Sequence, residues 1–232
     1  IEILEEKGDT VDKEGFEKAM QEQKAKARGA RKTTNYMGAE ETVYQQIDPA
    51  ITSKFVGYDR LTHDSKISVL TTEDEDVSAL TDGQTGTIIV DETPFYGTMG
   101  GQQGDIGTIE EGDNVFEVKD TIHLQGGRIG HVGKVVSGMF KVSDVVTLKV
   151  DSMNRLSTGK NHSATHLLQK ALRNVVGSHV EQKGSYVDAK RLRFDFSHFQ
   201  KVTDEQLREV EHLVNAKIRE NVPLTEYRNM PI

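Results

Sequence analysis

Residues 151–177 read DSMNRLSTGKNHSATHLLQKALRNVVG and separate two parts of the chain that have different patterns. Apolar residues recur in this stretch at helical spacing, which predicts an amphipathic helix with Gly177 as its C-cap. The apolar stripe consists of Ala164, Leu167, Leu168, Ala171, Leu172, Val175 and Val176. Because such a stripe must pack against other elements, we expect a second domain to begin near Asp151.

The residues after this helix predict the elements against which it packs. Residues 184–197 are expected to form two strands, because apolar and polar residues alternate from Leu192 to Ser197. Thr203 and Gln206 form a capping box at the start of a further amphipathic helix. The apolar face of that helix is expected to contain Leu207, Val210, Leu213, Val214 and Ile218.

The part of the chain before residue 151 has a β-rich pattern. Its short apolar runs are separated by Gly, Asp and Ser, and they occupy residues 42–47, 66–71, 87–90 and 145–150. Many short strands with turn signals and no long helical period predict a small antiparallel barrel or sandwich. We expect this barrel to span residues 37–150 and the α/β core to span residues 151–232.

The first 36 residues predict a helix that ends a preceding domain. Residues 12–32 consist of strong helix formers, and Lys and Arg crowd their second half. These cations have two interpretations that remain open, a solvated face suited to the helix dipole and an RNA-facing surface. The predicted fold class is therefore α+β, with a helix, a small antiparallel β-barrel and an α/β core in that order.

Composition limits the chemistry that the chain can carry. The 232 residues have a formal net charge of -8, no cysteine and no apolar run of the roughly 18 residues that a membrane span needs. Any metal bound here must use His or carboxylate ligands. Ile1 is preceded by no initiator Met or targeting signal, so we expect an internal piece of a longer protein. Between Lys149 and Arg193 there are nine Lys and Arg against three acids, and RNA is expected to bind there.

His162 and His166 are the strongest candidates for metal binding. A spacing of four residues on one helix places two imidazoles on the same face, roughly opposite the apolar stripe. A metal site and a pair of solvated histidines both remain open on this geometry. A zincin protease is excluded, because Ser163 stands where its catalytic Glu is required. A third ligand could come from His179 or His198, or from residues beyond Ile232.

Residues 94–105, PFYGTMGGQQGD, form a glycine-rich run without a charge before its final Asp. Glycines at this density allow sharp turns or the close approach of a ligand. A hairpin loop of the barrel is the simplest prediction. The run has no Lys followed by Ser or Thr and no following helix, so it is not a nucleotide-binding phosphate loop.

Four stretches together resemble the alanyl-tRNA synthetase family. They are GFEK at residues 15–18, FY through GGQ at residues 95–102, NHSATHLL at residues 161–168 and RLRFDFSH at residues 191–198. The resemblance implies a cytoplasmic ligase that charges tRNA(Ala) with alanine, with ATP and Mg bound by a domain upstream of this chain. It also implies an editing module that hydrolyses mischarged Ser-tRNA(Ala) and Gly-tRNA(Ala).

By the family pattern, His162 and His166 are two of four zinc ligands, and a later Cys-Gly-Gly-Thr-His motif supplies the others. That motif is absent from these residues. We therefore expect an incomplete zinc site and an isolated fragment without activity. Thr165 and Gln182 match catalytic-pocket positions that admit serine and exclude alanine, since polar partners favour a substrate hydroxyl.

The partner that the resemblance implies is the acceptor end of tRNA(Ala), and neither DNA nor a membrane is expected to bind. The residues expected to border its path are Lys183, Lys190, Arg191 and Arg193. Two alternatives remain: a free-standing alanyl-tRNA editing hydrolase, and an RNA-docking module without catalysis. Threonyl-tRNA synthetase has a related editing domain, but the glycine-rich run and the upstream helix favour the alanine enzyme.

Overall fold

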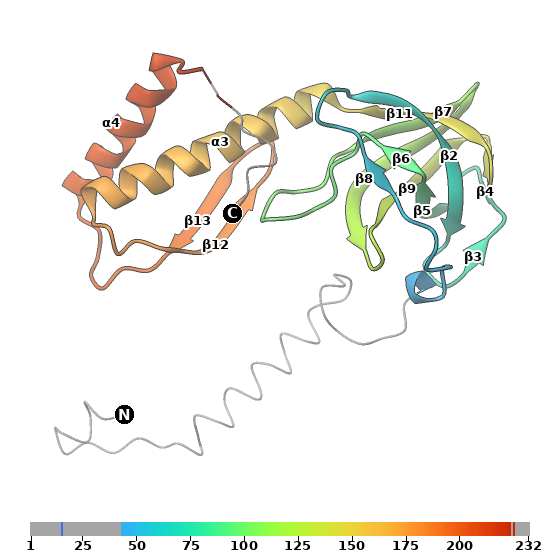
Figure 1. Ribbon diagram of the computed structural model, residues 1–232, viewed down its shortest axis with the longest axis horizontal. Helices are drawn as coiled ribbons and strands as arrows, with labels where there is room; N and C mark the ends of the chain where they lie inside the picture. Colours follow the sequence, from blue (N-terminus) through green and yellow to red (C-terminus); the bar gives the residue numbers. More distant parts are fainter. Residues whose placement is uncertain (1–14, 16–42, 224, 226–232) are drawn as a thin grey trace. The chain divides into compact units, whose positions relative to one another are not determined.

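The computed structural model describes residue 15, residues 43–223 and residue 225 (Figure 1). The chain divides into two compact units, residues 1–41 and residues 42–232. Except for Gly15, which has a helical backbone, the helix predicted over residues 12–32 lies outside the described residues. From residue 42 onward, the predicted barrel and core therefore fall within one compact unit, and the domain boundaries stay predictions.

Six antiparallel strands form a closed barrel in the order β2, β5, β9, β8, β7 and β11, and β11 pairs back onto β2. The barrel and the α+β class predicted from the sequence are confirmed. The strand bounds are Thr62–Thr71 for β2, Thr85–Val90 for β5, Gly107–Glu111 for β7, Asn114–Leu124 for β8, Arg128–Ser137 for β9 and Val145–Val150 for β11.

The barrel interior follows from the alternation of the strands. In β11, for example, Val146, Leu148 and Val150 are buried, whereas the residues between them are more exposed. Alternate side chains of a strand lie on opposite faces, so one face of each strand fills the barrel. The core contains Ile67, Leu70, Leu80, Ile88, Val90, Phe95, Ile109, Phe116, Val118, Val135, Phe140, Val146, Leu148 and Val150.

Short elements complete this part of the chain. Strand β3 extends the sheet beyond β2, β4 pairs with β10, and β1 pairs in parallel with β6. Their bounds are Lys54–Phe55 for β1, Asp76–Val77 for β3, Ala79–Thr81 for β4, Glu92–Thr93 for β6 and Met139–Lys141 for β10.

The strand predicted over residues 42–47 is wrong, because Val43–Gln45 forms a 3-10 helix. Val43 and Ile47 are buried but Gln45 between them is exposed, whereas strand alternation would place all three on one face. Ile47 packs with Val69 and Ile89 on the barrel. The segment therefore covers the barrel surface without joining a sheet.

The buried guanidinium of Arg128 anchors this segment. Its Nε donates to the carbonyl oxygen of Ile51 at 3.0 Å, and Nη2 donates to the carbonyl oxygens of Ile47 and Asp48 at 3.1 and 3.0 Å. Nη1 donates to the carbonyl oxygen of Gln125 at 2.8 Å. The fork geometry of Arg allows one side chain to connect the turn between β8 and β9 to two successive turns of the preceding segment.

His131 is fully buried in the barrel core and has both ring nitrogens paired. Nδ1 lies 2.8 Å from the carbonyl oxygen of Ile88, which only accepts, so Nδ1 carries the proton. Nε2 then accepts from the hydroxyl of Thr93 at 2.7 Å. The rings of His131 and Phe95 pack edge to face. These contacts satisfy a neutral imidazole, and burial lowers the pKa of His131 to about 4.

This burial predicts a loss of stability in acid. The pKa of His131 is about 4 in the folded chain and 6.5 as its ordinary value, so the unfolded chain binds the proton first as pH falls. The free energy of unfolding should decrease by about 2 kcal/mol between pH 7 and 5 from this group. Urea unfolding of the wild type and of His131→Gln at both pH values measures it. The Gln variant should lose less stability, and equal losses would contradict the assignment.

A second core lies between two helices and a strand pair. It contains the buried residues Ala171, Leu172, Val180 and Val210, with Leu168, Val175, Val176, Phe194, Phe196, Leu213 and Val214 packed against them. The elements are α3 (Ser152–Val175), β12 (Gln182–Val187), β13 (Leu192–Phe196) and α4 (Asp204–Glu220), and Figure 1 shows α3 following directly on β11. The predicted strand pair and both predicted helices are confirmed.

The helix ends agree with the sequence in most details. Asp151 caps α3 by accepting from the backbone N–H of Asn154, and the predicted capping box of Thr203 and Gln206 is present. The C-cap of α3 is Val176, one residue before the predicted Gly177. Gly177 follows with a positive φ of 139°, and the residue directly after a C-cap is commonly a glycine.

The predicted apolar face of α4 is only partly buried. Val210 is buried and Leu213 and Val214 pack beside it, but Leu207 and Ile218 are exposed. Neither Leu207 nor Ile218 belongs to the core cluster formed with α3 and the strand pair. Among the described residues, no helix is long and apolar enough to cross a membrane.

Candidate functional site

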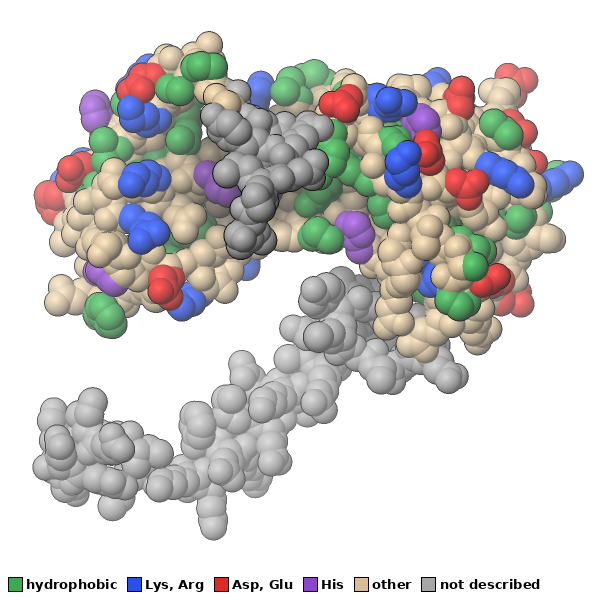
Figure 2. Space-filling view, in the orientation of Figure 1, with side chains coloured by type: hydrophobic (Ala, Val, Ile, Leu, Met, Phe, Trp, Pro, Cys, Tyr) green, Lys and Arg blue, Asp and Glu red, His purple; other side chains and the backbone are tan. Residues whose placement is uncertain are grey.

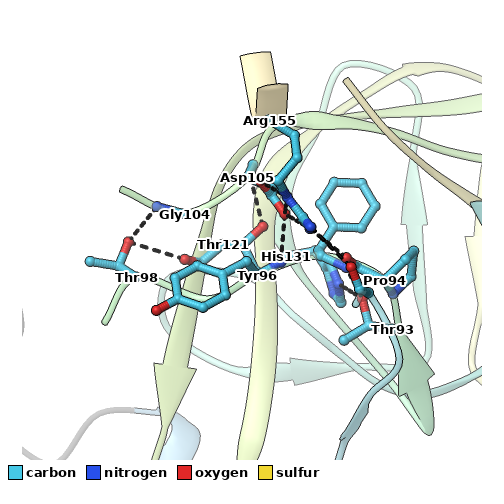
Figure 3. Close-up of polar contacts among 11 residues, drawn as sticks. Thr93, Pro94, Tyr96, Thr98, Gly104, Asp105, Thr121, His131 and Arg155 are labelled. Atoms are coloured by element: carbon cyan, nitrogen blue, oxygen red, sulfur yellow. Dashed lines mark hydrogen bonds and ion pairs between the residues drawn. The ribbon is translucent and has the colours of Figure 1, made fainter. Parts of the chain in front are cut away.

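The first turn of α3 is held against the barrel by Arg155. Its Nε donates to Asp105 Oδ1 at 2.9 Å, and Nη2 forms an ion pair with Asp105 Oδ2 (Figure 3). Nη1 and Nη2 also donate to the carbonyl oxygens of Gly57 and Pro94 at 3.0 and 2.8 Å. Asp105 is 2% exposed and also accepts from the backbone N–H of Tyr96. This network fixes α3 relative to residues 94–105.

Residues 94–105 are not the predicted hairpin loop of the barrel. They join β6 to β7, and these strands pair with other partners and not with each other. The run reaches β12, where Val187 donates to the carbonyl oxygen of Gly101 at 2.8 Å and accepts from the backbone N–H of Gln103 at 2.9 Å. The glycine-rich loop, residues 94–105, therefore links the barrel to the second core.

Gly101 makes this approach possible. Its φ is +84°, a conformation that side-chain-bearing residues rarely adopt. A Cβ at this position would lie 2.4 Å from Ser185 Oγ and 2.6 Å from the carbonyl oxygen of Ser185. The loop therefore passes β12 at a distance that only glycine allows.

His162 and His166 lie on one face of α3 with their rings stacked. The ring centroids are 5.3 Å apart and the ring planes differ by 11°. His162 Nδ1 lies 2.6 Å from Oε1 of Gln102 in the glycine-rich loop. Burial lowers the pKa of His162 below its ordinary value, and the neighbouring His166 lowers it further. Both effects favour the neutral imidazole, which is the form that binds a metal ion.

His179 and His198 do not join this pair. They contact each other, with His179 Nε2 2.8 Å from His198 Nδ1 and their ring centroids 5.1 Å apart. Within the described part of the chain, no group of three or more His, Asp or Glu could hold a metal ion. The alternative in which one of these histidines is the third ligand is therefore not supported. Among the described residues, His162 and His166 could therefore supply two of the four ligands of a zinc site.

The two predicted pocket residues lie in different environments. Thr165 is buried, and its hydroxyl donates to the carbonyl oxygen of Asn161 at 2.9 Å, so only its lone pairs remain for another partner. Gln182 is exposed at the start of β12, and its Nε2 donates to Ser185 Oγ at 3.1 Å. Ser185 Oγ in turn donates to the carbonyl oxygen of Gly100 at 3.4 Å. Gln182 is therefore connected to the same loop that contacts His162.

The four predicted tRNA-binding residues are exposed but differ in their partners. Lys183 pairs with Glu181 at 3.0 Å, and Arg193 pairs with Asp195 at 3.2 Å. The guanidinium of Arg191 lies over the ring of Tyr186, and among the described residues the ammonium group of Lys190 has no ion pair. Neither Lys190 nor Arg191 therefore forms a side-chain ion pair among the described residues, although the Asp188 carboxylate interacts electrostatically with Arg191.

A cleft of about 250 Å³ lies between the barrel, α3 and β12. Two lysines line it, Lys119 from β8 and Lys190 from the turn after β12, together with Asn154 and Tyr186. Elsewhere, basic and acidic side chains are interspersed on the face shown in Figure 2. The sequence did not single out Lys119, which lies in the acidic middle of the chain.

Three residues of this arrangement were missed by sequence reasoning. Gln102 and Asp105 lie in the glycine-rich run, and Arg155 lies in the first turn of α3. The sequence does show one indication of this ion pair. Asp105 is an isolated charge at the end of an uncharged run, and Arg155 is an Arg at the start of a helix. Their pairing joins positions 50 residues apart, so neither periodicity nor local spacing indicates it.

Comparison with known proteins was consistent with the motifs. A family model described as class II (A) tRNA synthetases matches residues 1–154. Over 223 residues, the chain is 63% identical to "Alanine--tRNA ligase 1" of Lachnoclostridium phytofermentans. This match covers 96% of the chain and 25% of the relative, so the chain spans about a quarter of the length of that protein. The resemblance drawn from the four motifs is confirmed.

Proposed function

Since the chain belongs to the family of class II (A) tRNA synthetases, we propose that it is part of a cytoplasmic alanine-tRNA ligase. We further propose that α3, β12 and the glycine-rich loop belong to an editing module that hydrolyses Ser-tRNA(Ala) and Gly-tRNA(Ala). The family match includes residues 1–42 upstream of the barrel. This extent supports a synthetase over a free-standing editing hydrolase.

The observation that carries the editing proposal is the pair of parallel imidazoles on α3, next to Gln102 and connected through β12 to Gln182. Solvated histidines would need no such partner, whereas a ligand imidazole is commonly oriented by a hydrogen bond to its other nitrogen. His162 and His166 would hold the zinc ion together with ligands from elsewhere in the longer protein. When bound, zinc polarises an ester carbonyl or positions a water molecule.

Two further polar side chains, Gln182 and Thr165, fit the selection of a hydroxyl-bearing substrate. Gln182 is exposed, and its amide oxygen has no hydrogen-bond partner within the described part of the chain, while its amide nitrogen donates to Ser185. An amide near the reacting ester can pair with the hydroxyl of serine, and it would remain unpaired with alanine. The hydroxyl of Thr165 donates its proton to Asn161 and can contribute only its lone pairs as acceptors. In this proposal, the side chains of the chain orient the substrate and select its hydroxyl group, and the metal ion would supply the positive charge that polarises the ester.

The editing proposal is tested by Gln182→Ala in the full-length enzyme. Release of serine from pre-charged tRNA(Ala) should fall about 10-fold or more, because the hydroxyl of serine loses its partner. Zinc content should be unchanged, since an amide is not a usual zinc ligand. Asn215→Ala on the exposed face of α4 is the matched amide control. Wild-type serine release by Gln182→Ala would show that this amide has no role in the pocket.

The proposed path of the tRNA acceptor end predicts a change in salt dependence. Lys190→Gln combined with Arg191→Gln should weaken tRNA binding and reduce the slope of log affinity against log salt by about 1.5 to 2. The matched control combines Lys183→Gln with Arg193→Gln. It should change the slope less, because Glu181 and Asp195 already neutralise those cations. An unchanged slope for the first pair would show that Lys190 and Arg191 belong to an ordinary solvated surface and do not contact the tRNA.

A further inference from the structure

We infer that Gln102 is a positioning residue for the metal site. Its side-chain carbonyl holds His162 in the tautomer that carries its proton on Nδ1, so that Nε2 presents a lone pair to the metal ion. This inference rests on the proposed function of the His162 and His166 pair. It assigns a role to the glycine-rich loop, which the motifs alone left without one.

The direction of the hydrogen bond follows from the chemistry of its two atoms. Oε1 of Gln102 lies 2.6 Å from Nδ1 of His162, and an amide oxygen only accepts. Nδ1 must therefore carry the proton. A neutral imidazole has one proton, so Nε2 has the free lone pair, and the hydrogen bond at one nitrogen determines which nitrogen binds the metal.

The amide of Gln102 is itself held in place by the backbone on both sides. Gln102 exchanges backbone hydrogen bonds with Met99, at 3.0 and 3.3 Å, and its neighbours Gly101 and Gln103 both bond to Val187 of β12. Its side chain is largely buried, with the residue 8% exposed. A side chain on such a fixed backbone loses little entropy when it orients its partner.

The hydrogen bond from His162 to Gln102 is not needed to hold the loop in place. The loop is joined to β12 by backbone groups, so this link does not require an amide at position 102. The one hydrogen bond of the Gln102 side chain within the described residues is with His162. That contact orients the ring of His162, whose plane lies 11° from the plane of His166 on the next helical turn.

The tautomer can be measured on this chain without metal. Long-range ¹H–¹⁵N NMR of the imidazoles distinguishes a protonated Nδ1 from a protonated Nε2. His162 should show Nδ1–H in the wild type and in Gln102→Glu, whose carboxylate also accepts. It should shift toward Nε2–H in Gln102→Ala, which has no acceptor. Gln103→Ala, which alters the neighbouring amide and keeps the backbone bonds, should resemble the wild type, and backbone amide spectra would verify folding.

Zinc affinity of the full-length enzyme, measured by chelator competition, gives the second readout. Gln102→Ala should weaken zinc binding about 10- to 100-fold, the usual effect of losing the partner of a ligand imidazole, and Gln102→Glu should restore it. Unchanged zinc affinity or an unchanged His162 tautomer in Gln102→Ala would overturn the inference alone. A wild-type enzyme that binds no zinc through His162 and His166 would overturn the proposed function and the inference with it.

Discussion

His166→Ala is expected to abolish the release of serine from pre-charged tRNA(Ala) by the full-length enzyme. His166 lies one helical turn after His162, with the two ring planes 11° apart, and it is the more exposed of the two. Removing the hydrogen-bond partner of a metal ligand typically lowers metal affinity or activity about 10- to 100-fold. Removing a ligand itself should therefore lower serine release by more than about 100-fold. Zinc content should fall in parallel, because three remaining ligands bind zinc more weakly than four.

The matched control is His212→Ala, which removes an exposed histidine from α4 without altering α3. It should retain both zinc and serine release. Aminoacylation with alanine should persist in both variants, because the proposal assigns ATP and alanine to another part of the enzyme. Full serine release by His166→Ala would remove the metal hypothesis and favour an RNA-docking module without catalysis.

Arg155→Met is expected to lower the free energy of unfolding by about 3 to 5 kcal/mol. The substitution keeps an unbranched apolar stem but leaves the carboxylate of Asp105, 2% exposed, without its cation. It also removes the donors to the carbonyl oxygens of Gly57 and Pro94. An uncompensated buried charge is more costly than the absence of a pair, so the expected effect is large. Urea unfolding at pH 7 measures it.

Two further variants separate the contribution of the buried charge. Adding Asp105→Asn to Arg155→Met should recover part of the loss, since the remaining amide is neutral. Arg208→Met, which breaks an exposed ion pair with Glu205 on α4, should cost less than about 1 kcal/mol. A loss at Arg155 as small as that at Arg208 would show that the network in Figure 3 does not hold α3 to the barrel.

Much of the fold could be predicted because the relevant patterns are local. The run at residues 145–150 became β11 with its predicted bounds, and Thr203 with Gln206 formed the predicted capping box. Residues 42–47 failed because a short apolar run does not distinguish a strand from a 3-10 turn. There the packing of Ile47 against Val69 and Ile89 decided the conformation, and that packing is not visible in the run itself.

The candidate site was predictable only where one helix supplies it. His162 and His166 share a face of α3 because of their spacing, which sequence alone shows. Gln102, by contrast, reaches His162 from 60 residues away, through a loop whose path depends on bonds to β12. Glycine density indicated that the backbone approaches something closely, but it did not indicate what. The partner of a loop is fixed by the tertiary fold and is beyond pattern reasoning.

The contact between the glycine-rich loop and β12 has a consequence for the order of events during translation. Gly100 and Ser185 are 85 residues apart, whereas the last barrel strand ends at Val150. At about 5 to 20 residues per second, the ribosome adds the residues from Val150 to Val187 in roughly 2 to 7 s. The barrel can close in that interval, before Val187 is available to form backbone hydrogen bonds with Gly101 and Gln103. The loop is thus synthesised early in this part of the chain but acquires its partners late.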